Sequence, residues 1–363
     1  MKTEVFRSFK KRGLILNRTF ARSATGLVAL SLLLAGCGTQ NTTTAPATNT
    51  PTTPSNASFK VGLVTDVGGL NDHSFNHLAY VGLQAAEAKY GISGSVVQSH
   101  QTSDYLTNLT NFAQAGDKLV IAVGYLMDSA VQTVSKKFPK TKFLIIDDAI
   151  TNRPNVASAL FNTQECGYLV GVMAGLMEKQ KGIAQINNKN TVGTIGGMQI
   201  PPVESYMAGF VAGVKKVDPT ANVLVGWANS FTDPASGEAI ANQQISNGAD
   251  IVFPVAGATG NGAITAAKQH NVFAIGVDAN QNYLAPQTVM TSALKAVDVA
   301  TETVIGQALH NQFKSGIVTF DLKNKGVGYA PPIKAVPASI VAQVNHYATL
   351  IESGKITPPS TLS

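Results

Sequence analysis

The chain has 363 residues, with 27 Lys and Arg against 21 Asp and Glu, which gives a formal net charge of +6 at pH 7. Residues 1–36 hold seven of the basic residues and one acidic residue, Glu4, so this segment alone accounts for the whole excess. The rest carries 20 basic and 20 acidic side chains, which excludes a partner attracted by positive charge alone, such as a nucleic acid.

The first 36 residues have the layout of a secretory signal peptide. A basic region is followed by an apolar stretch at 26–34 and then by Leu34-Ala35-Gly36-Cys37. The apolar stretch is too short for a helix that spans a hydrocarbon core of about 30 Å. The Leu-Ala-Gly-Cys order resembles the site where bacterial lipoproteins are cleaved and lipidated. We therefore expect a signal peptide at 1–36 and a lipid anchor on Cys37, with the protein on the extracytoplasmic face of the cell membrane. A plain signal peptide with an incidental cysteine is the alternative.

Residues 37–58 form a tract rich in Thr, Pro and Asn. The tract has no apolar periodicity, so it cannot bury a core, and we expect a flexible tether. The chain has only one other cysteine, Cys166, and a lipid on Cys37 would leave it no partner for a disulfide within the chain. Cys166 lies among small and apolar residues, which favours packing over a nucleophilic role.

About 300 residues remain from Phe59 onward, which favours two lobes over a single core. Short apolar runs alternate with helix-like segments, and the β-branched runs are typical of parallel strands covered by helices on both faces. The first series predicts strands at 59–65, 95–98, 118–123 and 142–146, and helices at 74–90, 104–115 and 127–138.

The alternation then begins again. The second series predicts strands at 156–161, 191–196, 222–227, 250–255, 272–277 and 289–294, and helices at 164–179, 203–216, 234–247, 260–270 and 296–313. An extended C-terminal stretch follows. Two such series predict an α/β fold with two doubly wound parallel-sheet lobes. Ligands of such sheets bind beyond the carboxyl ends of the strands, so the loops after the strands are the candidate site.

Carboxylates and an aromatic residue follow strands of the first lobe. The loop after the first strand runs from Thr65 to Asn76 and contains Asp66, two glycines and Phe75, and a later strand runs into Asp147. Taken singly, each residue also has a structural interpretation. Asp72 would be a helix N-cap, for example, and Phe75 a core residue. The whole set is difficult to explain as packing.

The second lobe has matching loops. Phe231 follows a strand, the loop at 255–262 contains Gly257, a strand ends on Asp278, and Lys295 follows the next strand. The glycines of 255–262 allow a backbone to approach a ligand closely. Their order is Gly-x-x-Gly-x-Gly and not the dinucleotide fingerprint, so a Rossmann cofactor is a weak interpretation.

Five motifs in order, at 65–76, 229–231, 255–262, 276–278 and 291–295, resemble the basic membrane lipoprotein family, whose best-known members are purine nucleoside receptors of the PnrA type that serve ABC importers. The resemblance covers about 59–329. It implies a type I periplasmic-binding-protein fold with three hinge crossings near 161, 291 and 315. The N-terminal lobe would be 59–161 plus about 295–314, and the C-terminal lobe 162–290 plus about 315–358.

The resemblance also implies roles for eight residues. Phe75 and Phe231 would sandwich a purine, since stacking on an aromatic side chain contributes about 1–3 kcal/mol per base. Asp66 and Asp147, with Asn76 nearby, would bind the base. Asp278 would accept the ribose hydroxyls, with Lys295 and the Gly257 backbone beside it. His73 stands where the family usually has Lys or Arg.

The leading hypothesis is a monomeric nucleoside receptor, for guanosine, adenosine or inosine, that delivers its ligand to the permease subunits of an ABC importer without a cofactor or a metal. A receptor for a sugar or another small polar solute is the second. A nucleoside hydrolase is the third, but the chain has no Asp-rich metal motif and no Gly-x-Ser-x-Gly, and its six histidines are scattered. A sensory role for the same receptor also stays open.

Overall fold

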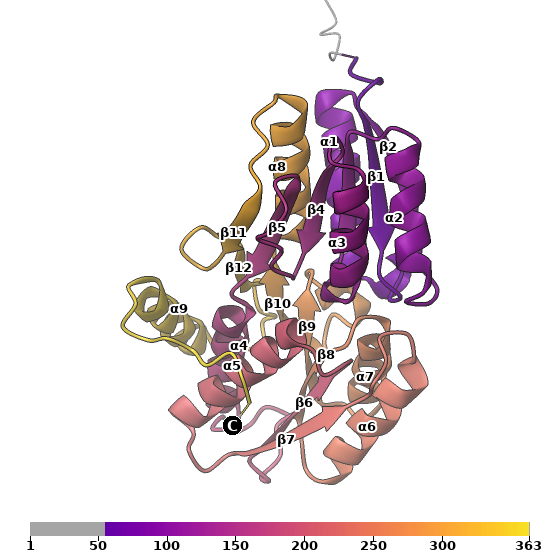
Figure 1. Ribbon diagram of the computed structural model, residues 1–363. Coiled ribbons are helices and arrows are strands. Elements are labelled where there is room, and N and C mark those ends of the chain that lie inside the picture. Colours follow the sequence, from indigo (N-terminus) through magenta and orange to yellow (C-terminus); the bar gives the residue numbers. More distant parts are fainter. Residues whose placement is uncertain (1–54, 363) are drawn as a thin grey trace, which may run out of the picture. The chain divides into compact units, whose positions relative to one another are not determined.

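The computed structural model describes residues 55–362, which form two α/β lobes (Figure 1). The expected signal peptide, the expected lipid anchor on Cys37 and most of the expected tether lie outside the described residues. Within residues 55–362, no helix combines the length and the hydropathy that crossing a membrane requires.

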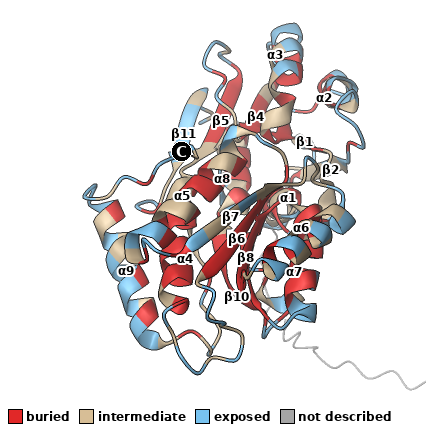
Figure 2. Ribbon diagram, turned by 90° about the horizontal axis from the view of Figure 1, so that it is seen from below, coloured by how far each residue is buried: buried red, intermediate tan, exposed pale blue. Residues whose placement is uncertain are grey.

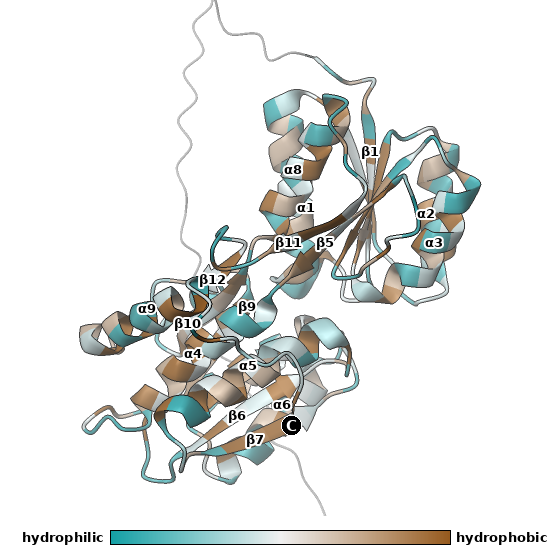
Figure 3. Ribbon diagram, turned by 60° about the vertical axis from the view of Figure 1, so that its left-hand side comes forward, coloured by the Kyte–Doolittle hydropathy of each residue, from teal (hydrophilic) through white to brown (hydrophobic). Residues whose placement is uncertain are grey.

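The first lobe has a six-stranded sheet in which every neighbouring pair of strands is parallel. Its strands, in spatial order, are β11 (Gly316–Phe320), β5 (Val156–Phe161), β4 (Lys142–Ile146), β3 (Leu119–Val123), β1 (Lys60–Thr65) and β2 (Ser93–Val97). Helices α1 (Phe75–Tyr90) and α8 (Val297–Leu309) cover one face, and α2 (Asp104–Gln114) and α3 (Asp128–Lys137) cover the other (Figure 3). Because both faces are covered, every residue of β3 is buried, which explains its uninterrupted apolar sequence.

The second lobe repeats this arrangement. Its strands, in spatial order, are β12 (Val327–Tyr329), β10 (Val289–Lys295), β9 (Phe273–Asp278), β8 (Ile251–Val255), β6 (Thr191–Gly196) and β7 (Asn222–Trp227). Only β12 among them pairs antiparallel. One face carries α4 (Thr163–Met177), α5 (Pro201–Val217) and α9 (Ala338–Glu352), and the other carries α6 (Pro234–Ser246) and α7 (Ala258–Gln269), with a buried core between them (Figure 2). The prediction of two parallel-sheet lobes is confirmed.

Helices α4 and α5 pack backbone against backbone. A Cβ atom on Gly167 would lie 2.2 Å from the Tyr206 carbonyl oxygen, and one on Gly171 would lie 2.2 Å from that of Phe210. Glycines of α5 make the reciprocal contacts, since a Cβ on Gly209 would lie 2.2 Å from the Gln164 oxygen. The close approach fixes α5 against α4, and with it the position of Tyr206.

The chain passes between the lobes three times: at Asn162 between β5 and α4, at Ala296 between β10 and α8, and at 321–326 between β11 and β12. The second and third passages differ from the expected positions near 291 and 315. Strand β10 stays in the second sheet through its pairing of Leu294 with Asp278. Residues 316–320 pair in parallel with β5, so they belong to the first lobe and not to the second, where the sequence analysis put them.

Candidate functional site

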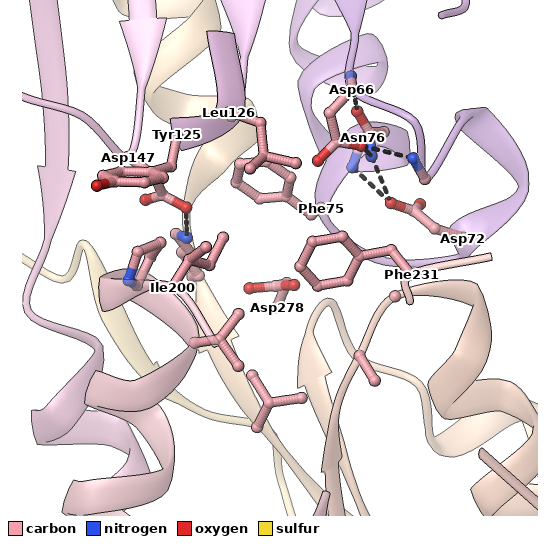
Figure 4. A pocket seen from close by; sticks show the side chains of 18 of the residues that line it. Asp66, Asp72, Phe75, Asn76, Tyr125, Leu126, Asp147, Ile200, Phe231 and Asp278 are labelled. Atoms are coloured by element: carbon pink, nitrogen blue, oxygen red, sulfur yellow. Dashed lines mark hydrogen bonds and ion pairs between the residues drawn. The ribbon is translucent and has the colours of Figure 1, made fainter. Parts of the chain in front are cut away.

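A cavity lies between the two lobes at the carboxyl ends of their strands (Figure 4). All eight residues of the predicted site line it: Asp66, Phe75, Asn76, Asp147, Phe231, Gly257, Asp278 and Lys295. Residues from loops more than 200 positions apart in the sequence therefore meet in one place.

Asp66 follows β1 and is held by a network within its own lobe. Its Oδ1 atom accepts hydrogen bonds from the Gly68 amide at 2.8 Å and from Asn76 Nδ2 at 2.7 Å. The Asn76 oxygen in turn accepts from the Asp66 amide at 3.0 Å. Both bonds to the carboxylate use Oδ1, so Oδ2 is the oxygen available to a ligand. Burial raises the pKa of Asp66 to about 7, although the hydrogen bonds from Asn76 and Gly68 oppose the shift.

Asn76 lines the cavity, but its amide is engaged with protein groups. Besides its two bonds with Asp66, Nδ2 donates to Asp72 Oδ2 at 3.1 Å. Asp72 also accepts the amide N–H groups of Ser74, Asn76 and His77, so it satisfies the first turn of α1. The N-cap of α1 is Ser74 and not Asp72, but the Asp72 carboxylate accepts the amides that a capping residue would. Asn76 orients Asp66.

Lys295, the last residue of β10, is buried and forms an ion pair with Asp147 Oδ2 of the first lobe. The sequence analysis expected Lys295 beside Asp278. Its ammonium group also lies 4.6 Å from the centre of the Phe75 ring and 5.0 Å from that of Phe161. Burial raises the pKa of Asp147, whereas the charge of Lys295 lowers it. The ion pair thus fixes an ammonium group against an aromatic wall of the cavity.

Asp278, the last residue of β9, is held from both lobes. Its Oδ1 accepts from the Tyr206 hydroxyl at 2.9 Å, and its Oδ2 accepts from the Ser74 hydroxyl at 2.6 Å. Asp278 and Asp147 both have left-handed backbones, with φ of 59° and 72°. Aspartate tolerates this conformation better than most residues, and its occurrence at both strand ends turns two carboxylates toward the cavity.

Phe75 begins α1 in the first lobe, and Phe231 lies in the loop after β7 in the second. Figure 4 shows both rings directed into the cavity from opposite sides. The Phe231 ring packs on Gly197, where a Cβ atom would lie 2.4 Å from a ring carbon. Its carbonyl accepts from the Thr259 amide at 3.2 Å, next to Gly257, whose φ is 54°. The glycines therefore hold the second aromatic side chain in place.

The sequence analysis missed several residues that line the cavity: Gly124, Tyr125, Leu126, Ile200, Pro202, Val203 and Tyr206. Gly124-Tyr125-Leu126 directly follow β3, so the rule used for the other strand ends would have found them. Tyr206 lies in the middle of α5, where no loop signal exists. Trp227 packs within its own lobe, because its ring lies against Gly196 and the core that includes Met207.

Two α/β lobes with facing strand ends, three crossings and a cavity between them define the type I periplasmic-binding-protein class of folds. A solved structure of this class, the solute-binding protein of an ABC transporter system from Aeropyrum pernix K1, is similar with a TM-score of 0.78 and 26% identity, over 84% of this chain and 94% of that chain.

Residues 59–359 match the family model described as ABC transporter substrate-binding protein PnrA-like. The chain is 34% identical to the ABC transporter nucleoside-binding protein BmpA of Lactococcus lactis over 94% of this chain and 99% of that protein. It is also 34% identical to the CD4+ T-cell-stimulating antigen of Listeria monocytogenes, over 94% and 98%. The chain belongs to the PnrA-like (Bmp) family of ABC transporter substrate-binding proteins, which confirms the resemblance inferred from its motifs.

Proposed function

We propose that this substrate-binding protein binds purine nucleosides between its lobes and delivers them to an ABC permease. The observation that carries the proposal is the entry of Phe75 and Phe231 into one cavity from opposite lobes, with carboxylates beside them. Two aromatic rings in one cavity suit a flat heteroaromatic base, because a base can stack on an aromatic side chain. The name of the Lactococcus relative supports the same ligand class.

The base would lie near Asp66. Since Oδ1 of Asp66 already accepts two protein hydrogen bonds, Oδ2 would accept from an N–H group of the purine. Guanosine and inosine carry such a group at N1. The Asn76 amide is engaged with Asp66 and Asp72, so it would contribute by holding Asp66 rather than by touching the base.

The ribose would lie near Asp278. Each oxygen of an ionised carboxylate can accept two hydrogen bonds, and here each accepts one from a protein hydroxyl. One acceptor position per oxygen is left, which matches the two hydroxyls of a vicinal diol. Gly257 would present its backbone at the same end.

Delivery requires that the ligand favour the closed arrangement. Because each lobe supplies half of the cavity, a bound nucleoside interacts with both lobes only when they are together, and this differential affinity shifts the protein toward closure. The permease would recognise the closed arrangement of the two lobes. A lipid on Cys37 would keep the protein beside the permease, as a monomer and without enzymatic activity.

Calorimetric titration of the protein with inosine, guanosine and adenosine, and with free ribose and glucose in parallel, tests the proposal. We expect saturable binding of nucleosides and a matching rise in the unfolding midpoint, since a ligand at 100 times its Kd stabilises the fold by about 2.7 kcal/mol. The variant Asp66→Ala should lose nucleoside binding. Binding of a sugar with no response to any nucleoside would refute the proposal, and release of free base on incubation would make the protein an enzyme.

A further inference from the structure

At the rim of the cleft, side chains of one lobe contact the other lobe directly. Residues 72–74, here called the rim loop, belong to the first lobe, and residues 277–283, the facing segment, belong to the second. The Ser74 hydroxyl donates to Asp278 Oδ2 at 2.6 Å and lies 3.2 Å from the Val277 carbonyl oxygen. Gln281 Nε2 donates to the His73 carbonyl at 3.2 Å, and the Tyr283 hydroxyl lies 3.0 Å from His73 Nδ1.

The rim loop is fixed within its own lobe. His73 has a left-handed backbone, with φ of 56°, and the Asp72 carboxylate on one side of it accepts the amides of Ser74 and His77 on the other. Ser74 precedes α1, but its hydroxyl makes no capping bond to the helix. The hydroxyl is thus available to the other lobe without a cost to α1.

The facing segment is fixed as well. Gln281 is buried, and its side-chain Oε1 accepts from the Val277 amide at 2.9 Å. Its backbone N–H donates to Ser292 Oγ at 3.0 Å. The Ser292 hydroxyl donates to Asn282 Oδ1 at 3.0 Å. The amide of Gln281 that crosses to His73 is therefore held in position by its own lobe.

We propose that the rim loop and the facing segment form a latch that holds the lobes together when no ligand is bound. The rim loop and the facing segment are bridged by three side chains: Ser74, Gln281 and Tyr283. Because both halves are preformed, joining them orders few additional groups. His73, which does not line the cavity, acquires a role here as the partner of Tyr283.

The latch has a consequence for ligand affinity. When a fraction of the receptor molecules is closed without ligand, the binding groups of both lobes are already assembled in that fraction. The apparent Kd is the intrinsic Kd divided by this closed, binding-competent fraction. Ser74 connects closure of the lobes with ligand binding, because its hydroxyl bonds the same Asp278 carboxylate that faces the cavity.

Hydrogen–deuterium exchange of the full chain, freed of ligand by unfolding and refolding, tests the latch. The variants are Ser74→Ala, which removes only a hydroxyl, and Tyr283→Phe, which alters a side chain that is 59% exposed. In each variant, peptides covering the rim loop and the facing segment should exchange faster, since losing one interlobe hydrogen bond raises the open fraction about fivefold.

Matched controls are Ser353→Ala and Tyr329→Phe, whose hydroxyls bond within the second lobe. Rim exchange equal to that of the controls in both variants would overturn the proposal. If Ser74→Ala does not fold, the exchange measured for Tyr283→Phe, a substitution at an exposed side chain, tests the latch by itself. The assay uses no nucleoside, so failure of the latch and failure of the proposed ligand class are separate results.

Discussion

The ammonium group of Lys295 in the second sheet is paired with the carboxylate of Asp147 in the first, and both side chains are almost completely buried. Each partner would be a costly isolated charge in this position, so the pair must be kept or lost together. Lys295 directly precedes the crossing at Ala296, which puts the pair next to the hinge.

Lys295→Met should lower the free energy of unfolding by about 3–5 kcal/mol, because it leaves the Asp147 carboxylate buried without its counter-charge. Urea denaturation measures the change. Adding Asp147→Asn should restore much of the loss, since the charge is then removed. Lys89→Met, which breaks the exposed pair with Glu302, is the control and should have little effect. An equally small effect of Lys295→Met would show that the buried pair is not structurally important.

Nucleoside affinity should depend on pH through Asp66. Burial raises the pKa of Asp66 to about 7, so its carboxylate form, the form that accepts from N1–H, dominates only above neutral pH. Affinity for inosine should fall about tenfold per pH unit as the pH drops below 7 and level off above it. Calorimetry between pH 5.5 and 8.5 measures this, and Asp66→Asn should remove the dependence. A flat profile in the unsubstituted protein would contradict the assignment of Asp66 to the base.

Phe75→Ala and Phe231→Ala should each weaken nucleoside binding by about 1–3 kcal/mol, the range for stacking of one base on one aromatic side chain. Trp227→Phe is the control, because Trp227 does not line the cavity. Equal affinities in all three variants would exclude stacking between the rings. The affinity for free ribose should not change with either phenylalanine substitution.

Gly171→Ala should destabilise the protein, although alanine in a helix is normally more favourable than glycine by about 1 kcal/mol. The added Cβ would lie 2.2 Å from the Phe210 carbonyl oxygen, so α4 and α5 would have to separate. The unfolding midpoint should fall. Gly328→Ala, where nothing lies within 4 Å of the added atom, is the control. An unchanged midpoint for Gly171→Ala would mean that the helix pair can separate at little cost.

Stability should decrease with rising pH through Glu178 and Asp250, two neighbouring buried carboxyl groups. Burial and the neighbouring Asp250 raise the pKa of Glu178, so the folded state holds a proton that the unfolded chain releases above about pH 4.5. Folding is therefore favoured most at low pH and less as the pH rises. Glu178→Gln should reduce this slope in urea denaturation at pH 5 and 8, whereas Glu238→Gln should not.

The sequence predicted most of the fold because doubly covered parallel strands have continuous apolar runs. Strand β11 was missed although Ile317, Val318 and Phe320 form a short apolar run, and as an edge strand it leaves Ile317 and Val318 exposed. The positions of the eight predicted residues after strands indicated that they line the cavity. Those positions did not indicate which protein groups form hydrogen bonds or ion pairs with them. Which carboxylate pairs with Lys295, and that Tyr206 reaches Asp278 from within a helix, depend on how the two lobes meet.

The three crossings mean that no continuous segment of this chain encodes a complete lobe. The first lobe requires α8 to cover one face of its sheet and β11 to complete its edge, and both are synthesised more than 130 residues after β5. A fragment ending at residue 161 would leave the apolar face that packs on α8 exposed to water. The lobes should therefore resist expression as separate fragments, and neither can finish folding until almost the whole chain has been made.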